Sequence, residues 1–283
     1  IIPWKNVMLS GWCLASDKTK MSKSKGNIIT PTALIEEKGV DAVRLWCASS
    51  SLGMDTHYSE EFLEVGKKFT NKLWNVAKFM AMKEEQLLLT SEITESFDKW
   101  IVLELANLIS RYKSYMDKFE YSKAKEALDN FFWKDLCDNY MEIIKVRYYG
   151  LEALIYKDTA PSNPEVVIHG QQSCLRALDL VFRGILILYS PFSCFITEEL
   201  YEIFYETSIS EGSNLKNFVL PQIKNFEFDQ KVLYIIEEVR KFKSLNNLSM
   251  NSKIEEFEIS RLNLEGYLDD LKNVTGVLNF KFV

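Results

Sequence analysis

Apolar residues recur at every third or fourth position through most of the stretch 59–200, and this spacing constrains the fold most strongly. It predicts a helix over 59–83, a second at about 97–117, a third at about 122–149, and another that Pro191 breaks or kinks. The stripe on the first of these helices consists of Phe62, Phe69, Leu73, Val76 and Met80. Because each helix has one apolar face to bury, the pattern predicts a bundle and a mainly α fold.

The charge balance limits the classes of partner. The 283 residues are 47% hydrophobic, which is enough for the core of one large or two modest domains. With 34 Lys+Arg against 40 Asp+Glu the net charge is -6, which argues against indiscriminate coating of nucleic acid. The first thirty residues nevertheless hold five lysines against Asp17 alone. A local positive surface on an acidic body permits shape-specific RNA binding.

Cysteine and histidine usage predicts neither disulfides nor a metal. The cysteines are odd in number and scattered, without a Cys-x-x-Cys pair: Cys13, Cys47, Cys137, Cys174 and Cys194. We expect free, buried thiols in a reducing cytosol. His57 and His169 have no second plausible ligand nearby, so no metal centre is expected. No signal peptide or membrane-spanning run is recognisable, which predicts a cytoplasmic protein. The start at Ile1, without Met, predicts a piece of a longer protein.

Residues 20–27, with the sequence KMSKSKGN, combine clustered cations, hydroxyls and a glycine. Three lysines within six positions repel one another, so their grouping is favourable if a polyanion such as a nucleotide triphosphate or an RNA backbone neutralises them. Thr30 can cap a following helix, Pro31 suits its first position and Gly39 can end it. The lysines therefore lie in a loop before a helix. On charge alone, a solvated loop without function is the alternative.

Lys20 to Ser24 is identical to the KMSKS signature of class I aminoacyl-tRNA synthetases, and Gly26, Asn27 and Pro31 also resemble that family. The resemblance implies a remnant of a Rossmann-type catalytic domain, so we expect the apolar run 7–11 to be a strand of its parallel sheet. Nothing resembles the His-x-Gly-His motif with which these enzymes hold ATP. Half of the active site is therefore expected to be absent.

The same resemblance assigns roles within the loop. Lys23 is expected to be the principal contact to ATP, with Lys20 as its helper, and these two are the expected catalytic residues. Met21, Ser22 and Ser24 complete the ATP-binding motif by shaping the loop. Mg²⁺ would arrive with ATP, and no protein-bound metal is expected.

Three further segments resemble particular subfamilies. Residues 71–75 followed by Phe79 resemble the Asn-Lys-Leu-Trp-Asn segment of valyl-tRNA synthetases. Residues 132–145 resemble a pattern in the anticodon-binding domain of those enzymes, displaced by one residue at the Phe. The stretch from Ser190 to Leu200 resembles one common to valine, isoleucine and leucine enzymes, although Ser190 replaces the usual His and Tyr201 the usual Trp.

Several charged residues leave alternatives open. Arg44 is expected to pair with Asp41 rather than to contact RNA. A salt-bridge ladder of Asp138, Glu142 and Lys145 is favoured over acid–base chemistry. Candidate tRNA contacts, chosen because they are cationic and expected to be exposed, are Lys67, Lys68, Lys72 and Arg147; plain solvated charge is an equal alternative for them.

The expected organisation has three parts. Residues 1–86 would end the catalytic domain and contain stem-contact helices, 87–226 would form the anticodon-binding bundle, and 227–283 a small α+β unit. In the last part we expect a strand around 254–259, a helix over 264–271 and a strand over 277–282. Loops are expected at 87–94 and 157–164.

The resemblance thus implies part of a monomeric valine-tRNA ligase. The whole enzyme would activate valine with ATP and transfer it to tRNA(Val), while this segment alone would be inactive. The alternatives are an isoleucyl-tRNA synthetase fragment, a tRNA-binding module without catalytic role, and a helical scaffold with a chance lysine loop.

Overall fold

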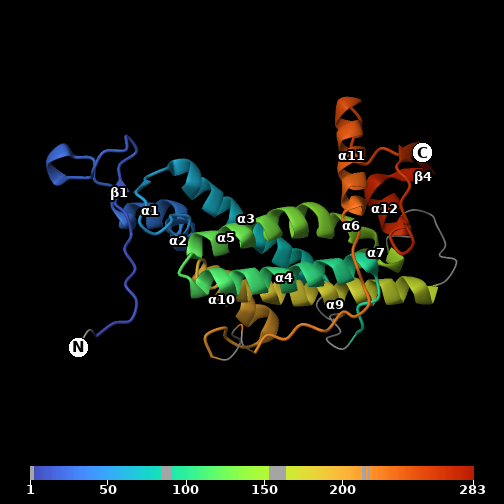
Figure 1. Cartoon of the computed structure of the whole chain (residues 1–283), viewed down its shortest axis with the longest axis horizontal. Helices are drawn as coiled ribbons and strands as arrows, with labels where there is room; N and C mark the ends of the chain where they lie inside the picture. The colour runs from blue at the N-terminus through green and yellow to red at the C-terminus, as the bar shows by residue number, and fades with distance from the viewer. Residues whose placement is uncertain (1–2, 84–90, 153–163, 212–214, 216) are drawn as a thin grey trace. The chain divides into compact units, whose positions relative to one another are not determined.

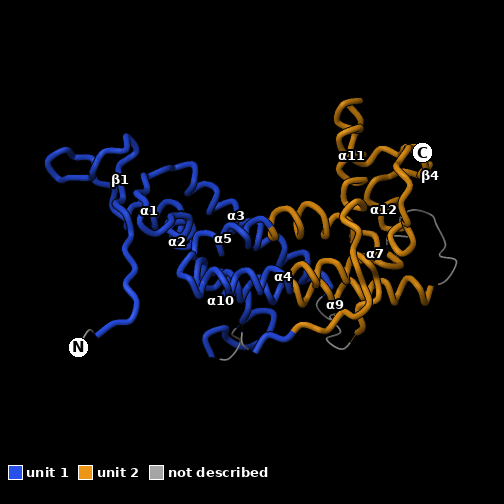
Figure 2. Tube along the Cα trace, viewed as in Figure 1, with its two compact units in different colours: residues 1–84, 106–130, 182–219 blue, residues 85–105, 131–181, 220–283 orange. Residues whose placement is uncertain are grey.

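The computed structural model describes residues 3–83, 91–152, 164–211, 215 and 217–283. Contacts within the chain divide it into two compact units (Figure 2). Unit 1 comprises 1–84, 106–130 and 182–219, and unit 2 comprises 85–105, 131–181 and 220–283. Two long helices, α4 (Ser96–Asp117) and α9 (Pro164–Tyr189), contribute residues to both. Helices dominate each unit (Figure 1), which confirms the mainly α fold.

Unit 1 begins with a minimal parallel sheet of β1 (Cys13–Leu14) and β2 (Thr56–His57). The expected strand at 7–11 is wrong, because regular pairing starts only at Cys13. The chain before it does follow 53–56, but through irregular bonds such as that from the Trp12 N–H to the Asp55 carboxylate, at 2.7 Å. The side chains of this segment remain exposed, with Leu9 at 73%.

Helices α1 (Pro31–Lys38), α2 (Val40–Ala48) and α3 (Glu60–Ala81) follow. Pro31 occupies the first turn of α1, as predicted, and Gly39 separates α1 from α2 with a φ of 89°. Ser59 caps α3 by accepting the Phe62 N–H. The predicted stripe on α3 is buried except at Phe62, which is 50% exposed. Leu63 is buried instead, because α1 and α2 cover its side of the first turn.

Close packing of α2 against α3 depends on Gly66. A Cβ atom at this position would lie 2.8 Å from the Ala42 Cα atom and 2.9 Å from its carbonyl oxygen, so no side chain fits without moving α2. We expect Gly66→Leu to reduce the free energy of unfolding by about 1–3 kcal/mol, as overpacking does. Urea denaturation measures this, with Asn71→Leu on the exposed face of α3 as the control. Equal midpoints for the two variants would contradict the packing argument.

The rest of unit 1 comes from α5 (Tyr121–Asn130), α10 (Cys194–Tyr205) and the adjoining parts of α4 and α9. Two tyrosines fix these helices to one another. The Tyr112 hydroxyl donates to the Leu188 carbonyl at 3.0 Å, and the Tyr189 hydroxyl to the Asp129 carboxylate at 2.7 Å. Pro191 follows the end of α9, as predicted.

Unit 2 contains the first part of α4 and then η3 (Phe131–Tyr140), a ten-residue π-helix, followed by α6 (Met141–Ile143) and α7 (Lys145–Tyr149). The segment 122–149, predicted as a single helix, is therefore helical apart from a turn at Ile144, but its middle is wound more loosely. In a π-helix the hydrogen bonds run over five residues, which widens each turn. Phe131 and Phe132, at the start of η3, are both buried.

The C-terminal part of unit 2 consists of α11 (Lys231–Leu245), β3 (Ile254–Ile259), α12 (Leu268–Thr275) and β4 (Val277–Phe282). Strands β3 and β4 are parallel, with Ile254 opposite Val277, and α12 is their crossover helix. The predicted order of strand, helix and strand is correct. The helix begins at Leu268 rather than Leu264, because residues 264–267 form a turn closed by the Tyr267 N–H.

Three other predictions can be compared with the structure. Residues 91–94, the described part of the predicted loop 87–94, are not helical. The predicted loop 157–164 lies outside the described residues except for Pro164. All five cysteines are free, but only Cys137 and Cys174 are buried; Cys13 and Cys47 are exposed, contrary to expectation. None of the helices within the described ranges has both the length and the apolar character required to cross a membrane.

Candidate functional site

The lysine-rich loop is held in shape by a short network around Asn27. The Asn27 side chain accepts the Ser22 N–H at 2.9 Å and donates to the Thr19 hydroxyl at 3.1 Å and to the Lys20 carbonyl at 3.3 Å. One amide thus fixes both ends of the segment that contains Met21 and Ser22. The loop can present its lysines without the support of a long helix.

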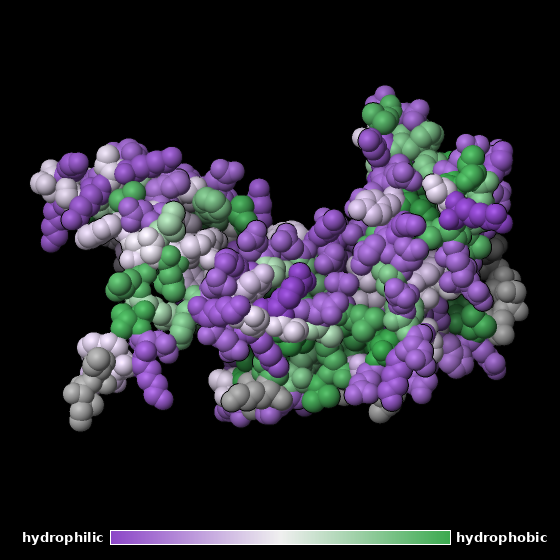
Figure 3. Space-filling view, viewed as in Figure 1, coloured by the Kyte–Doolittle hydropathy of each residue, from purple (hydrophilic) through white to green (hydrophobic). Residues whose placement is uncertain are grey.

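Lys23 lies in η1 (Lys23–Lys25), a single 3₁₀ turn. The Ser22 hydroxyl caps this turn by accepting the Lys25 N–H, and Gly26 ends it with a φ of 66°, a left-handed conformation that favours glycine. Lys23 is therefore not part of a continuous helix. This confirms the prediction that the lysines lie in a loop before a helix. Hydrophilic side chains cover this region in Figure 3.

The three lysines of the loop are exposed and have no carboxylate within ion-pair distance among the described residues. The Lys20 ammonium instead lies 4.3 Å from the centroid of the Trp12 ring. Asp17 is the nearby acid; the N–H and hydroxyl of Thr19 hydrogen-bond its carboxylate and lower its pKa, with a smaller contribution from Lys25. The cationic charge of the loop is thus available to an anionic ligand.

Met21, in the loop, lines an apolar cavity of about 410 Å³ in unit 1. The walls of the cavity include Trp12, Leu34, Trp46 and Cys47. Leu34 and Trp46 also belong to the buried cluster that joins α1, α2 and α3. The loop is therefore anchored on the apolar core of unit 1 through Met21, while its lysines face outward.

Asp41 and Arg44 do not pair with each other, so that expectation is wrong. Both bind the turn between α9 and α10. The Arg44 guanidinium donates to the Pro191 carbonyl at 2.8 Å and the Phe192 carbonyl at 3.2 Å. The Asp41 carboxylate accepts the N–H groups of Phe195 at 3.3 Å and Ile196 at 2.8 Å. Helix α2, which comes after α1, is thereby fixed to the turn at 190–193.

The C-terminal two thirds of α3 present a cationic surface, defined here as Lys67, Lys68, Asn71, Trp74, Asn75 and Lys78. These six residues lie on one side of the helix because their spacings are three and four positions, and all are exposed. Lys72 lies beside them and is half-buried. No aspartate or glutamate occurs between residues 65 and 83. An exposed helix face with cations, amides and an indole suits a nucleic-acid backbone.

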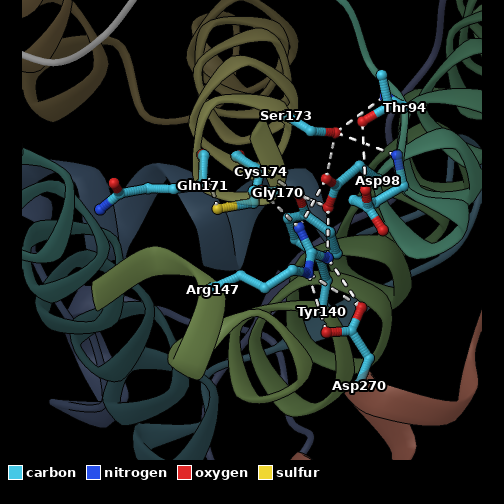
Figure 4. Close-up of polar contacts among 10 residues, drawn as sticks. Thr94, Asp98, Tyr140, Arg147, Gly170, Gln171, Ser173, Cys174 and Asp270 are labelled. Carbon is cyan, nitrogen blue, oxygen red and sulfur yellow. Dashed lines mark hydrogen bonds and ion pairs between the residues drawn. The ribbon is translucent and has the colours of Figure 1, made fainter. Parts of the chain in front are cut away.

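Arg147, the fourth candidate RNA contact, was expected to be exposed, but the structure buries it. Its side chain is only 14% exposed and lies between two acids of unit 2 (Figure 4). It forms two bonds to Asp98, at 2.8 and 2.9 Å, and three to Asp270, the shortest at 2.9 Å. A further bond to the Gly170 carbonyl, at 3.1 Å, occupies the guanidinium fully. Arg147 therefore joins α4, α9 and α12 to α7.

The two acids differ in their surroundings. Asp98 is completely buried and also accepts the hydroxyls of Tyr140 at 2.8 Å and Ser173 at 2.6 Å. Asp270 has Arg147 as its charged partner, and burial raises the pKa of its carboxyl above the ordinary value although Arg147 opposes this. Asp98 is thus saturated with donors, whereas Asp270 relies on one cation.

Sequence reasoning found the loop but missed what holds it and what surrounds Arg147. The ties made by Asn27 join residues up to eight positions apart within a loop, and no periodicity marks them. Asp98 and Asp270 are 172 positions apart in the chain.

The predicted salt-bridge ladder is present in part. Lys145 pairs with Glu142 at 2.6 Å, whereas the backbone carbonyl of Asp138 accepts a hydrogen bond from Arg240. In the described ranges, no three His, Cys, Asp or Glu side chains are arranged to hold a metal ion.

The family of the chain follows from two matches that agree with this geometry. Residues 98–259 match the family described as the anticodon-binding domain of tRNA ligases, and residues 2–59 match class I tRNA synthetases of the I, L, M and V group. The chain belongs to the class I tRNA synthetases with an anticodon-binding domain.

Within that family the similarity is to valine enzymes. Valine--tRNA ligase of Rickettsia conorii (strain ATCC VR-613 / Malish 7) is 41% identical over 297 residues, which cover 99% of this chain and 35% of the relative. The Rickettsia prowazekii (strain Madrid E) enzyme is 40% identical, covering 100% of this chain and 35% of its own. The resemblance to valyl-tRNA synthetases is confirmed. The chain spans about a third of the length of these relatives.

Solved structures agree in fold. Mycobacterium tuberculosis methionyl-tRNA synthetase bound by methionyl-adenylate superposes with a TM-score of 0.54 at 21% identity, covering 67% of this chain and 36% of that one. At this identity the likeness concerns the fold alone. It supports the mainly helical architecture.

Proposed function

We propose that this chain is the part of a valine-tRNA ligase that supplies the ATP-phosphate loop and contacts tRNA(Val). The whole enzyme would activate valine with ATP and transfer it to that tRNA. The observation that carries the proposal is the loop 20–27, whose three exposed lysines have no acidic ion-pair partner in the described parts of the chain. Similarity to valine enzymes along the whole chain supports the choice of amino acid.

Lys23 is the proposed principal catalytic group, with Lys20 as its helper. In activation a carboxylate oxygen of valine bonds to the α-phosphorus of ATP, the bond from that phosphorus to the bridging oxygen breaks, and pyrophosphate leaves. Negative charge grows on the phosphates in the transition state, where a cation stabilises it. At an effective dielectric constant of about 20, an ammonium roughly 4 Å from a phosphate charge contributes on the order of 4 kcal/mol before desolvation.

That contribution is too small to account for catalysis by this segment alone. Enzymes lower their barriers by about 8 to 23 kcal/mol in total. Met21, Ser22 and Ser24 shape the loop, and Mg²⁺ would arrive with ATP. Binding of valine and of the adenosine part of ATP must come from other parts of the ligase. We therefore expect this segment, expressed alone, to catalyse no pyrophosphate exchange.

The proposed functional division keeps residues 1–86 as the end of the catalytic domain, 87–226 as the anticodon-binding part and 227–283 as the small appendage. A cytoplasmic, monomeric ligase is the state that we propose for the whole protein. Of the four candidate RNA contacts, Lys67, Lys68 and Lys72 remain; we leave out Arg147 because its donors are engaged within unit 2.

Removing two cations from α3 tests the RNA contact. We expect Lys67→Ala with Lys68→Ala to weaken tRNA binding by roughly tenfold at 0.1 M salt, because each lysine that neutralises a phosphate releases a counterion. The slope of log Kd against log salt should fall by about 1.4–1.8. The control is Lys123→Ala with Lys145→Ala, two lysines that pair with Glu120 and Glu142. An unchanged slope in the α3 variant would rule out this surface as the RNA contact.

A further inference from the structure

The start of α10 is capped by a residue from another helix. The first N–H groups of a helix have no intrahelical acceptor, and the side chain of the N-cap residue usually binds them. The N-cap residue of α10 is Ser193, but its side chain makes no capping bond. The buried carboxylate of Asp41, in α2, accepts the Phe195 and Ile196 N–H groups instead.

The hydroxyl of Ser193 consequently takes no part in capping α10. It is completely buried and has no hydrogen-bond partner among the described residues. A buried hydroxyl without a partner is unfavourable, yet serine is one of the best N-cap residues. Its ψ of 63° lies outside the extended range usual for a capping residue. A change of ψ and of the side-chain rotamer would bring the hydroxyl to one of the two amides, of Phe195 and Ile196, that Asp41 now binds.

We propose that Asp41 and Ser193 are alternative N-caps of α10. When Asp41 lies at the turn, it binds the Phe195 and Ile196 amides, and the Ser193 hydroxyl binds neither. When α2 moves away, Ser193 replaces Asp41 at one of the two amides, so the start of α10 keeps a capping bond. Arg44 belongs to the same joint, because its bonds to the Pro191 and Phe192 carbonyls would break in the same step.

An exchangeable cap lowers the cost of separating α2 from the turn at 190–193. Helix α2 follows α1 through Gly39 alone, and α1 begins four positions after Asn27. Movement of the loop 20–27 together with these two helices would therefore act on this joint. This functional consequence rests on the proposed function, whereas the exchange of caps does not.

Hydrogen–deuterium exchange of the Phe195 and Ile196 amides tests the proposal, with Ser193→Ala, Asp41→Ala and the double variant compared. Ser193→Ala should leave the rates unchanged, and Asp41→Ala should raise them less than about twofold. The double variant should exchange about fivefold faster than Asp41→Ala, which is the usual effect of losing an N-cap. The matched control is Ser190→Ala combined with Asp41→Ala, since the Ser190 hydroxyl already donates to the Ile187 carbonyl.

Equal exchange in Asp41→Ala and the double variant would overturn the proposal, because Ser193 would then not replace Asp41. Faster exchange in Ser193→Ala alone would also overturn it. Failure of Asp41→Ala to fold would count against it too, since a reserve cap predicts a folded variant. The experiment needs neither ATP nor RNA, so its outcome is independent of whether the proposed function is correct.

Discussion

Arg147→Met is expected to destabilise unit 2 by roughly 3–5 kcal/mol, the usual cost of removing one partner from a buried ion pair. Methionine keeps much of the volume but leaves the carboxylates of Asp98 and Asp270 without a cation. Asp98 retains the hydroxyls of Tyr140 and Ser173, whereas Asp270 loses its charged partner. Urea denaturation of the chain measures the loss.

The control for Arg147→Met is Lys145→Ala, two positions earlier. Lys145 pairs with Glu142 at 2.6 Å, but both side chains are about half exposed, and exposed pairs contribute little. A small effect of Lys145→Ala beside a large one of Arg147→Met would attribute the loss to burial. Equally small effects would contradict the conclusion that Arg147 joins α4, α9 and α12 to α7.

The loss in Arg147→Met should also depend on pH. Burial raises the pKa of Asp270 in the folded chain, while Arg147 opposes the shift, so removing Arg147 should raise this pKa further. A carboxyl whose folded pKa exceeds its unfolded value destabilises the fold as pH rises through the interval between them. The variant should therefore lose less stability at pH 5 than at pH 8. An equal loss at both values would show that Asp270 does not protonate.

Lys23→Ala in a full-length valine-tRNA ligase that carries this segment is expected to slow valine-dependent pyrophosphate exchange by about 10²–10³-fold. Losing a preorganised donor to transition-state charge has effects of this size. The change should appear in kcat more than in the KM for valine, because the ammonium interacts most strongly with charge that develops on the phosphates. Steady-state exchange kinetics measure both quantities.

Lys25→Ala is the matched control, since Lys25 is an exposed lysine of the same 3₁₀ turn and is assigned no contact to ATP. It should slow exchange much less than Lys23→Ala. A Lys23→Ala enzyme with unchanged kcat would refute the assignment of Lys23. Equal losses for the two variants would indicate a general effect of charge rather than a specific contact.

The sequence predicted the long helices well because their apolar stripes are local. The stripe on α3 and the Ser59 cap lie within one segment and can be inferred without knowledge of neighbours. Phe62 was wrongly predicted to lie on the buried face of α3. The packing of α1 and α2 decides which residue of the first turn is covered, and the sequence of α3 alone does not reveal it. The π-helical winding of 131–140 leaves no signal that separates it from an α-helix in the residue spacing.

The functional residues divide in the same way. The loop 20–27 is a continuous motif, so its position before a helix could be predicted. The sequence predicts an exposed Arg147 and an Arg44 paired with Asp41, but both are engaged by residues far along the chain, at Asp270 and at Pro191. Pairing across such separations is decided by the fold. Exposure was therefore predicted correctly for Lys67 and Lys68 and wrongly for Arg147.

Competition between tRNAs for this chain tests the central claim most directly. A labelled valine tRNA would be displaced by unlabelled valine tRNA, isoleucine tRNA and a valine tRNA that carries the isoleucine anticodon, at constant salt. The account predicts that valine tRNA competes at least tenfold better than either of the others. Equal competition by all three, or preference for isoleucine tRNA, would contradict the assignment of this chain to tRNA(Val).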